Sequence, residues 1–336
     1  MPAFPALVAA KPKFLTGDRL LAGAAVGAAG VVLLMLVSLL VVLIHASWPA
    51  WKQFGTQFVT STEWRPNELE TPKRDAAGKV VEDEDGNTVM ETQPAKFGAL
   101  AIIWGTTVSS VIALAFAVPL AFGAALFLVR LAPNALRTPV SFLIEFLAAI
   151  PSIAYGTWGL FVLVPVLRNY VEPGILKLLG QPADGLTGRD LLCGGLILGI
   201  MVLPIITAVA RDVLAAVPVQ QVEGSLALGA TWWQSAKQML VYAKAGLFGA
   251  VMLGLARAAG ETMAVTMVIG NNNQIAASVF KPAQTMSSLL ANEFGNPESG
   301  LHRSALVAVA LILLAMSLVF NVVARTLVVG KSRRAA

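Results

Sequence analysis

The chain has 336 residues, of which 57% are hydrophobic and 13% are charged, and its formal net charge is +5. An ordinary soluble domain carries about a quarter charged residues, so this composition excludes a conventional soluble enzyme. The apolar residues fall in runs long enough to cross a bilayer, which takes about 20 residues per helix. The sequence therefore predicts an all-α polytopic membrane protein.

Six stretches with few or no charged residues are predicted to span the membrane. They cover residues 20–44, 97–129, 138–167, 191–210, 245–280 and 304–324. The first stretch is longer than the core of a signal peptide, and no clear cleavage site follows it before Trp48, so we expect it to remain as a transmembrane helix. Four prolines interrupt the spans and predict bent helices around a cavity: Pro119, Pro151, Pro165 and Pro204.

The distribution of Lys and Arg predicts that both termini are cytoplasmic. With the amino terminus inside, the inside segments hold twelve basic residues against three acidic ones, whereas the outside segments hold eleven against fourteen. Basic residues favour the cytoplasmic ends of spans. The same asymmetry accounts for the net charge, and no basic stripe interleaved with aromatic residues predicts nucleic-acid binding.

The predicted spans divide the chain into five parts. These are a cytoplasmic tail (1–19), a first transmembrane helix (20–45), an acidic extracytoplasmic loop (46–97), a five-span domain (98–328) and a basic cytoplasmic tail (329–336). Within the outer loop, residues 79–90 place two short β-prone runs around an acidic turn, which predicts a hairpin. This hairpin is either a docking surface for an extracytoplasmic partner or a solvated acidic insertion.

Few residues offer metal, redox or nucleotide chemistry. Cys193 is the only cysteine, and the two histidines, His45 and His302, are far apart in the sequence, so we expect no metal and no cofactor. Gly330-Lys331-Ser332 looks like the end of a P-loop, but Arg325 stands where its first glycine would be. We find no internal repeat of the kind that inverted-repeat secondary transporters carry.

The longest predicted inside loop, residues 211–244, is expected to be folded. Pro218 suits the start of a short helix and Gly229 can end it, after which Trp232 and Trp233 open a second amphipathic helix. Without further information, this pair of helices is also typical of a simple amphipathic element at the membrane surface.

This loop and its surroundings resemble the permeases of phosphate-specific ABC importers, within the family of binding-protein-dependent transport inner-membrane components. Glu223-Gly224-Ser225 followed by Gly229 is similar to the EAA loop of these permeases. The matching segments over about 98–328 also include Ile150 to Gly156, Leu203 to Ile206, Ala227 to Thr231, Gly254 to Thr266 and Ile269 to Asn271. The extra first span and early loop resemble the PstC type of subunit more than the PstA type.

The resemblance implies a type I importer permease fold and the function of a phosphate-importing subunit without a catalytic centre. It implies that the EAA loop couples the chain to an ATPase through Glu223, Gly224, Ser225, Ala227, Gly229 and Ala230. The implied partners are a second permease (PstA-like), a dimer of ATP-binding subunits (PstB-like), an extracytoplasmic phosphate-binding protein (PstS-like) and membrane lipid. The implied location is the cytoplasmic (inner) membrane.

The chain departs from the family pattern at two places. Gly224 and Ser225 replace alanines, a change that conserves small size. Tyr242 stands where the family tends to have proline, and because proline fixes φ and removes an N–H donor, this departure affects the expected backbone after Met239.

Arg257 and Glu261 are four residues apart in an otherwise apolar run, so a continuous helix would place them on one face. Charges at membrane depth are costly and normally face a partner charge or an aqueous path. The two residues are therefore either a structural ion pair or an anion site, in which the planar guanidinium grips phosphate oxygens.

Other polar residues near these segments are candidates for the substrate path or for structural roles. Ser152, Tyr155 and Thr262 carry hydroxyls, although hydroxyls in membrane helices often bond a neighbouring backbone. Glu145 lies eight residues after Arg137 and could pair with a basic residue near the cytoplasmic interface.

Three alternatives remain open from the residues alone. An arginine in the path suits phosphonate or sulfate as well as phosphate. An ATP-independent secondary anion transporter or channel would also explain Arg257 and Glu261. A membrane-embedded enzyme is disfavoured, since no paired carboxylates, metal ligands or nucleophile with a base converge in the spans.

Overall fold

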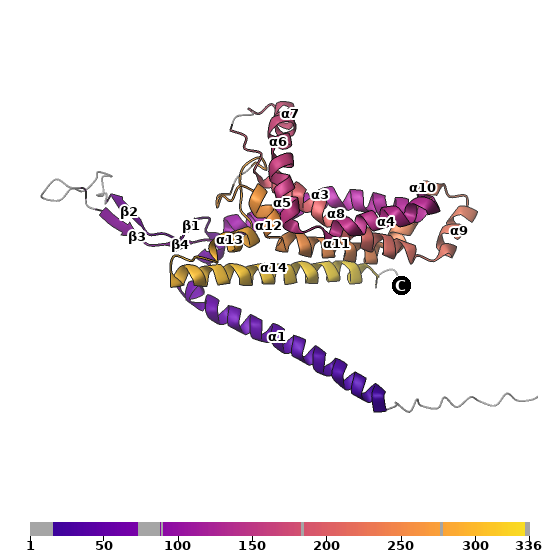
Figure 1. Ribbon diagram of the computed structural model, residues 1–336, viewed down its shortest axis with the longest axis horizontal. Helices are drawn as coiled ribbons and strands as arrows, with labels where there is room; N and C mark the ends of the chain where they lie inside the picture. Colours follow the sequence, from indigo (N-terminus) through magenta and orange to yellow (C-terminus); the bar gives the residue numbers. More distant parts are fainter. Residues whose placement is uncertain (1–15, 73–87, 89, 183–184, 276–277, 333–336) are drawn as a thin grey trace, which may run out of the picture.

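The computed structural model describes residues 16–72, 88, 90–182, 185–275 and 278–332 as a helical bundle (Figure 1). Its long helices are α1 (Thr16–Phe54), α3 (Leu100–Leu126), α8 (Leu191–Ala215), α11 (Lys244–Gly260) and α14 (Gly300–Ser332). Shorter helices are α2 (Gln57–Thr60), α4 (Asn134–Ala149), α5 (Ser152–Trp158), α6 (Val164–Val166), α7 (Glu172–Leu178), α9 (Val219–Ala227), α10 (Trp232–Tyr242), α12 (Met263–Val268) and α13 (Met286–Glu293). Three π-helical stretches join them, at Phe127–Leu131, Gly159–Leu163 and Leu167–Val171.

The centre of the bundle is the close packing of α3 against α8. Four fully buried alanines recur at every fourth position of α3, which places them on one face: Ala113, Ala117, Ala121 and Ala125. On α8, a Cβ added at Gly195 would lie 2.5 Å from Ile112 Cγ2, and one added at Gly199 would lie 2.8 Å from Phe116 Cδ1. Small residues on both helices therefore let the two backbones approach, as is usual for helices in membranes.

This packing predicts that a large side chain at Gly199 destabilises the protein. In Gly199→Ile the added atoms would overlap Phe116 and the Ala113 carbonyl, and overpacking costs about 1–3 kcal/mol. Thermal unfolding of the purified protein in detergent should show a lower melting temperature. Gly123→Ile on α3 is the control, because a Cβ there meets nothing within 4 Å; an equal loss in both variants would contradict the packing argument.

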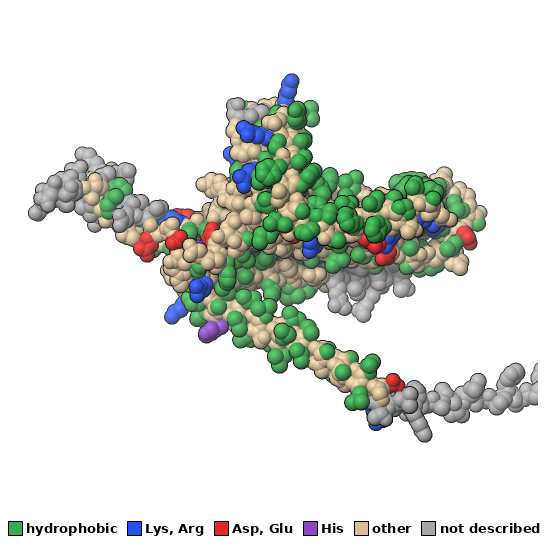
Figure 2. Space-filling view, in the orientation of Figure 1, with side chains coloured by type: hydrophobic (Ala, Val, Ile, Leu, Met, Phe, Trp, Pro, Cys, Tyr) green, Lys and Arg blue, Asp and Glu red, His purple; other side chains and the backbone are tan. Residues whose placement is uncertain are grey.

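The carboxyl-terminal end of α1 is held by α14. The Ser304 hydroxyl accepts a hydrogen bond from the Ala50 N–H (3.1 Å) and donates one to the Ala46 carbonyl (2.9 Å). These backbone groups would bond each other in an uninterrupted helix, and Pro49 beside them has no N–H to donate. Farther toward its start, α1 leaves the bundle (Figure 1) and exposes apolar side chains along its length (Figure 2).

The loop between α1 and α3 forms two short antiparallel ribbons, β1 (Trp64–Arg65) with β4 (Lys96–Phe97) and β2 (Leu69–Pro72) with β3 (Met90–Gln93). Most of the predicted hairpin over 79–90 lies outside the described residues.

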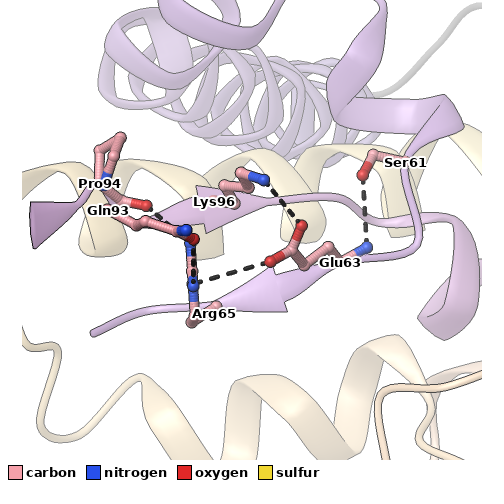
Figure 3. A network of polar contacts seen from close by, with 6 residues as sticks. All are labelled: Ser61, Glu63, Arg65, Gln93, Pro94 and Lys96. Atoms are coloured by element: carbon pink, nitrogen blue, oxygen red, sulfur yellow. Dashed lines mark hydrogen bonds and ion pairs between the residues drawn. The ribbon is translucent and has the colours of Figure 1, made fainter. Parts of the chain in front are cut away.

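Polar contacts hold the base of the ribbons (Figure 3). The Lys96 ammonium lies 3.1 Å from a Glu63 carboxylate oxygen, and Arg65 donates to the Pro94 carbonyl at 3.1 Å. Deeper in, Glu293 Oε2 accepts from Trp64 Nε1 and lies 2.9 Å from His302 Nε2. Because the exposed pairs contribute little, the partly buried Glu293 contacts are the ones that fix the loop to α13 and α14.

Among the described helices, five are long and apolar enough to cross a membrane, and the count is six if the pair α10 and α11, bent by 69°, is one span. This agrees with the six predicted spans, but two boundaries differ. The helix predicted over 138–167 breaks at Ile150-Pro151, and the apolar helical stretch runs instead over Ser152–Leu178. Proline disfavours the helical conformation of the residue before it, and Ile150 is extended.

The span predicted over 245–280 is also interrupted. The helix α11 ends at Gly260, the short helix α12 follows, and residues 269–285 contain no helix in their described part. Glu261 adopts an extended conformation (φ −71°, ψ 131°) at this break. The apolar composition of the segment therefore predicted one span, but it did not predict the break in the backbone.

Two acidic residues are buried where α7 meets the start of α8. Both carboxylate oxygens of Glu172 and the Oδ2 atom of Asp190 are inaccessible to solvent. None of these three atoms has a hydrogen-bond donor among the described residues. Their carboxyls interact, and because two adjacent carboxylates repel, a proton held by one of them would relieve the repulsion. Burial raises the pKa of Asp190, opposed by the hydrogen bond that its Oδ1 accepts from the Cys193 N–H at 2.8 Å.

A carboxyl with a raised pKa stabilises the fold fully only below its unfolded pKa, about 4, and this stability is lost as the pH rises through the folded value. Asp190→Asn keeps an acceptor for Cys193 but removes the charge. We expect its melting temperature to exceed that of the wild type at pH 8, by a margin that shrinks as the pH falls, and to match it only below about pH 4. Glu68→Gln, on an exposed residue, is the control; an Asp190→Asn variant with the wild-type pH profile would exclude titration of Asp190 as the cause.

Candidate functional site

The α9–α10 turn is at the end of the bundle opposite the ribbons (Figure 1). The Gly229 N–H donates to the Leu226 carbonyl (2.9 Å), and the Ala230 N–H donates to the Ser225 carbonyl (3.1 Å). These two bonds form a Schellman motif, which needs a left-handed residue just after the helix. Gly229 has φ +85°, so the predicted helix end at this glycine is confirmed.

The start of α10 is fixed by a capping box that our sequence analysis missed. Thr231 Oγ1 accepts from the Gln234 N–H (3.3 Å), and Gln234 Oε1 accepts from the Thr231 N–H (2.7 Å). A threonine followed three residues later by glutamine is the recognisable pattern. The Ser225 hydroxyl also contacts the Ser235 hydroxyl at 2.9 Å, and this contact joins the two helices into one rigid corner.

The residues predicted to couple the chain to an ATPase are mostly accessible on this corner. Glu223, Gly224, Ala227 and Gly229 are exposed, whereas Ser225 and Ala230 are half-buried. Apolar side chains are exposed around them: Val219, Leu226, Leu228 (91% exposed), Trp232 and Trp233. A cluster of exposed apolar residues is typical of a surface that another protein covers. Tyr242 does not disturb this geometry, since it is the last residue of α10 and the helix is intact up to it.

The left-handed turn predicts opposite effects at two neighbouring glycines. Gly224 lies in α9 and Gly229 has positive φ, yet a Cβ at either position meets nothing within 4 Å. Gly229→Ala should cost about 1–2 kcal/mol in the corner, whereas Gly224→Ala should stabilise α9 by about 0.5–1 kcal/mol. Hydrogen exchange of the 219–242 backbone should accelerate only in Gly229→Ala; slower exchange there would contradict the assignment.

Arg257 and Glu261 do not lie on one continuous helix, which corrects the geometry expected from their spacing. The helix ends between them, and no described residue forms an ion pair with Arg257, whose side chain is exposed on α11. Glu261 is buried, its Oε1 accepts from the Ala264 N–H (3.4 Å) and its carbonyl accepts from the Ser287 hydroxyl (2.6 Å). Glu261 therefore stabilises the start of α12, and Arg257 has no ion pair within the described part of the chain.

The other predicted path residues are placed around the same break. Thr262 Oγ1 donates to the Gly260 carbonyl at 3.3 Å. Ser152 begins α5, which packs on α12 so closely that a Cβ at Gly156 would lie 2.9 Å from Ala264 Cα. The Tyr155 hydroxyl instead donates to the Leu147 carbonyl at 2.8 Å, across the break between α4 and α5. This bond gives Tyr155 a structural role.

Glu145 pairs with a basic residue at the same end as the α9–α10 turn. Both terminal nitrogens of Arg211 lie 3.2 Å from Glu145 Oε1, and Arg211 also lies 2.9 Å from Asp212 Oδ1. This contact joins α4 to α8. Glu145 therefore has a structural partner, Arg211, and does not pair with Arg257.

A bundle of apolar helices, an accessible corner at one end and an exposed arginine without an ion pair among the described residues together fit a membrane transport component. Residues 117–330 match the family model described as binding-protein-dependent transport system inner membrane component. The chain belongs to this family. It is thus a multi-pass membrane protein and a transport subunit, not an enzyme.

Several curated relatives match most of the chain. The phosphate transport system permease protein PstC of Haemophilus influenzae is 40% identical over 306 residues, 88% of each chain. PstC of Mesorhizobium japonicum is 40% identical over 321 residues, 93% of this chain and 90% of the relative. The probable PstC of Methanocaldococcus jannaschii is 36% identical over 240 residues, 69% and 76% of the two chains.

Among solved structures, one match is to the MetNI methionine ABC transporter in inward-facing conformations. The match has a TM-score of 0.46 and 19% identity, and it covers 68% of this chain and 94% of the MetNI chain.

Proposed function

We propose that the chain is the permease subunit of an ATP-driven importer of inorganic phosphate. The observation that supports this most directly is the 40% identity, over about nine tenths of the chain, to relatives named phosphate transport system permease protein PstC. By the same argument the chain works with a second permease (PstA-like), two ATP-binding subunits (PstB-like) and an extracytoplasmic phosphate-binding protein (PstS-like). It lies in the cytoplasmic membrane with both termini and the α9–α10 turn inside.

Arg257 is proposed as the residue that binds phosphate in the translocation path. Its side chain is exposed and unpaired among the described residues, and an unpaired guanidinium at membrane depth needs an anion or water. A guanidinium can donate two parallel hydrogen bonds to phosphate oxygens. Glu261 holds the break beside it, and the hydroxyls of Thr262 and Ser152 lie on the adjoining elements.

Coupling to the ATPase is proposed to pass through the α9–α10 corner. The corner is rigid because both of its helix ends are capped, and its exposed apolar residues offer a contact surface. It is connected to Arg257 by a short path, since α10 leads through Ala243 directly into α11. Movement of the corner would therefore move the helix that carries Arg257.

The substrate proposal predicts that Arg257→Gln abolishes phosphate uptake. The test is ATP-dependent uptake of radiolabelled phosphate by proteoliposomes that contain the co-expressed complex, with sulfate as competitor. Uptake should resist sulfate and fall at least a hundredfold in Arg257→Gln, while the control Arg303→Gln, on another exposed arginine, should keep wild-type uptake. Wild-type uptake in Arg257→Gln would return Arg257 to a structural role, and uptake without ATP would exclude an ABC importer.

The coupling proposal predicts loss of uptake from changes at the corner without loss of the protein. Glu223→Ala and Gly229→Arg should abolish phosphate uptake, because one removes the exposed carboxylate and the other distorts the turn. Immunoblots of membranes should show unchanged amounts of the chain. Full uptake in Gly229→Arg would contradict the proposed contact.

A further inference from the structure

A narrow apolar groove lies where α10 and α11 meet α3. Its volume is about 340 Å³, and almost all of its wall is hydrocarbon. The apolar lining consists of Phe122 of α3, Leu240 and Val241 of α10, and Leu247, Phe248 and Val251 of α11. The groove lies next to the junction between α10 and α11, where the two helix axes are bent by 69° relative to each other.

Two lysines complete the wall of this groove. Lys237 on α10 and Lys244 at the start of α11 both line it and are both exposed. Neither has an acidic partner among the described residues. The acidic residues Glu145 and Asp212, on neighbouring elements, are already paired with Arg211. The groove therefore combines an apolar interior with uncompensated positive charge.

We propose that this groove binds an anionic phospholipid, with one acyl chain against the apolar wall and the headgroup phosphate between Lys237 and Lys244. Basic pockets between transmembrane helices on the cytoplasmic side are suited to anionic headgroups. The exposed Trp232 and Trp233 at the other end of α10 are residues that favour the membrane interface. The leaflet follows from the proposed orientation, whereas the binding itself does not depend on it.

The groove is separate from the substrate region. At 100° per residue, the α11 positions that line the groove lie roughly 130° around the helix from Arg257. A lipid here would not enter the phosphate path. It would contact α3, α10 and α11 together, and would brace the joint between the coupling corner and the helix that carries Arg257.

Native mass spectrometry of the co-expressed, detergent-purified complex, titrated with phosphatidylglycerol or phosphatidylcholine, tests this proposal. Because each lysine near a lipid phosphate contributes about a fivefold gain in affinity, Lys237→Gln with Lys244→Gln should weaken phosphatidylglycerol binding about 25-fold. Phosphatidylcholine, which has no net charge, should bind weakly to both forms. The control is Lys177→Gln with Lys281→Gln, which removes the same charge from two exposed lysines outside the groove.

A second variant tests the acyl-chain part of the groove. Val241→Trp fills the groove from a half-exposed position and leaves both lysines in place, so it should also reduce phosphatidylglycerol binding. Equal binding by the wild type and the lysine variant, or equal binding of the two lipids, would overturn the proposal. So would displacement of the lipid by millimolar inorganic phosphate, since that result would indicate a simple anion site without a bound chain.

Discussion

Close packing between α3 and α8 is the contact on which the rest of the bundle depends. The alanine stripe of α3 and the glycines Gly195 and Gly199 of α8 bring the two backbones together. In a membrane there is little hydrophobic driving force between helices, so association relies on van der Waals contact and hydrogen bonds. The helices α4, α5, α11 and α12 pack in turn on α8, and both candidate sites are attached to elements that this central pair positions.

Around this centre, hydroxyl groups satisfy backbone groups at two helix breaks and beside the proline of α1. The Tyr155 hydroxyl bonds the Leu147 carbonyl beside the Pro151 break, the Ser287 hydroxyl bonds the Glu261 carbonyl, and the Ser304 hydroxyl joins two backbone groups of α1. An unsatisfied backbone group costs several kcal/mol in hydrocarbon. These hydroxyl bonds satisfy backbone groups that would otherwise be unpaired, so the helices can bend or break there. One such break separates Arg257 from Glu261.

The two ends of the bundle differ in chemistry. At one end, buried contacts of Glu293 with Trp64 and His302 fix a small β-ribbon region. At the other, a Schellman motif and a capping box shape a corner whose outer face is apolar. The helix α11 connects this corner with Arg257, and the lysine-lined groove lies at the joint. The proposed ATPase coupling, phosphate binding and lipid binding would thus all involve helix α11.

Local sequence patterns predict many of the secondary-structure elements of this protein. Hydropathy alone predicted the membrane helices, and Pro218, Gly229 and the tryptophans predicted the shape of the α9–α10 corner, because caps and turns depend on residues a few positions apart. The Thr231–Gln234 box was equally readable, although we missed it.

The tertiary structure decided what depends on distant residues. Spacing placed Arg257 and Glu261 on one helical face, but the helix ends between them, where a hydroxyl 26 residues away binds the Glu261 carbonyl. The partner of Glu145, 66 residues away, was likewise not readable. Sequence by itself determined which segments enter the membrane and where the corner turns, since those properties are local. Only the fold determined which polar groups are paired and that Arg257 has no ion pair among the described residues, because pairing depends on which helices come into contact.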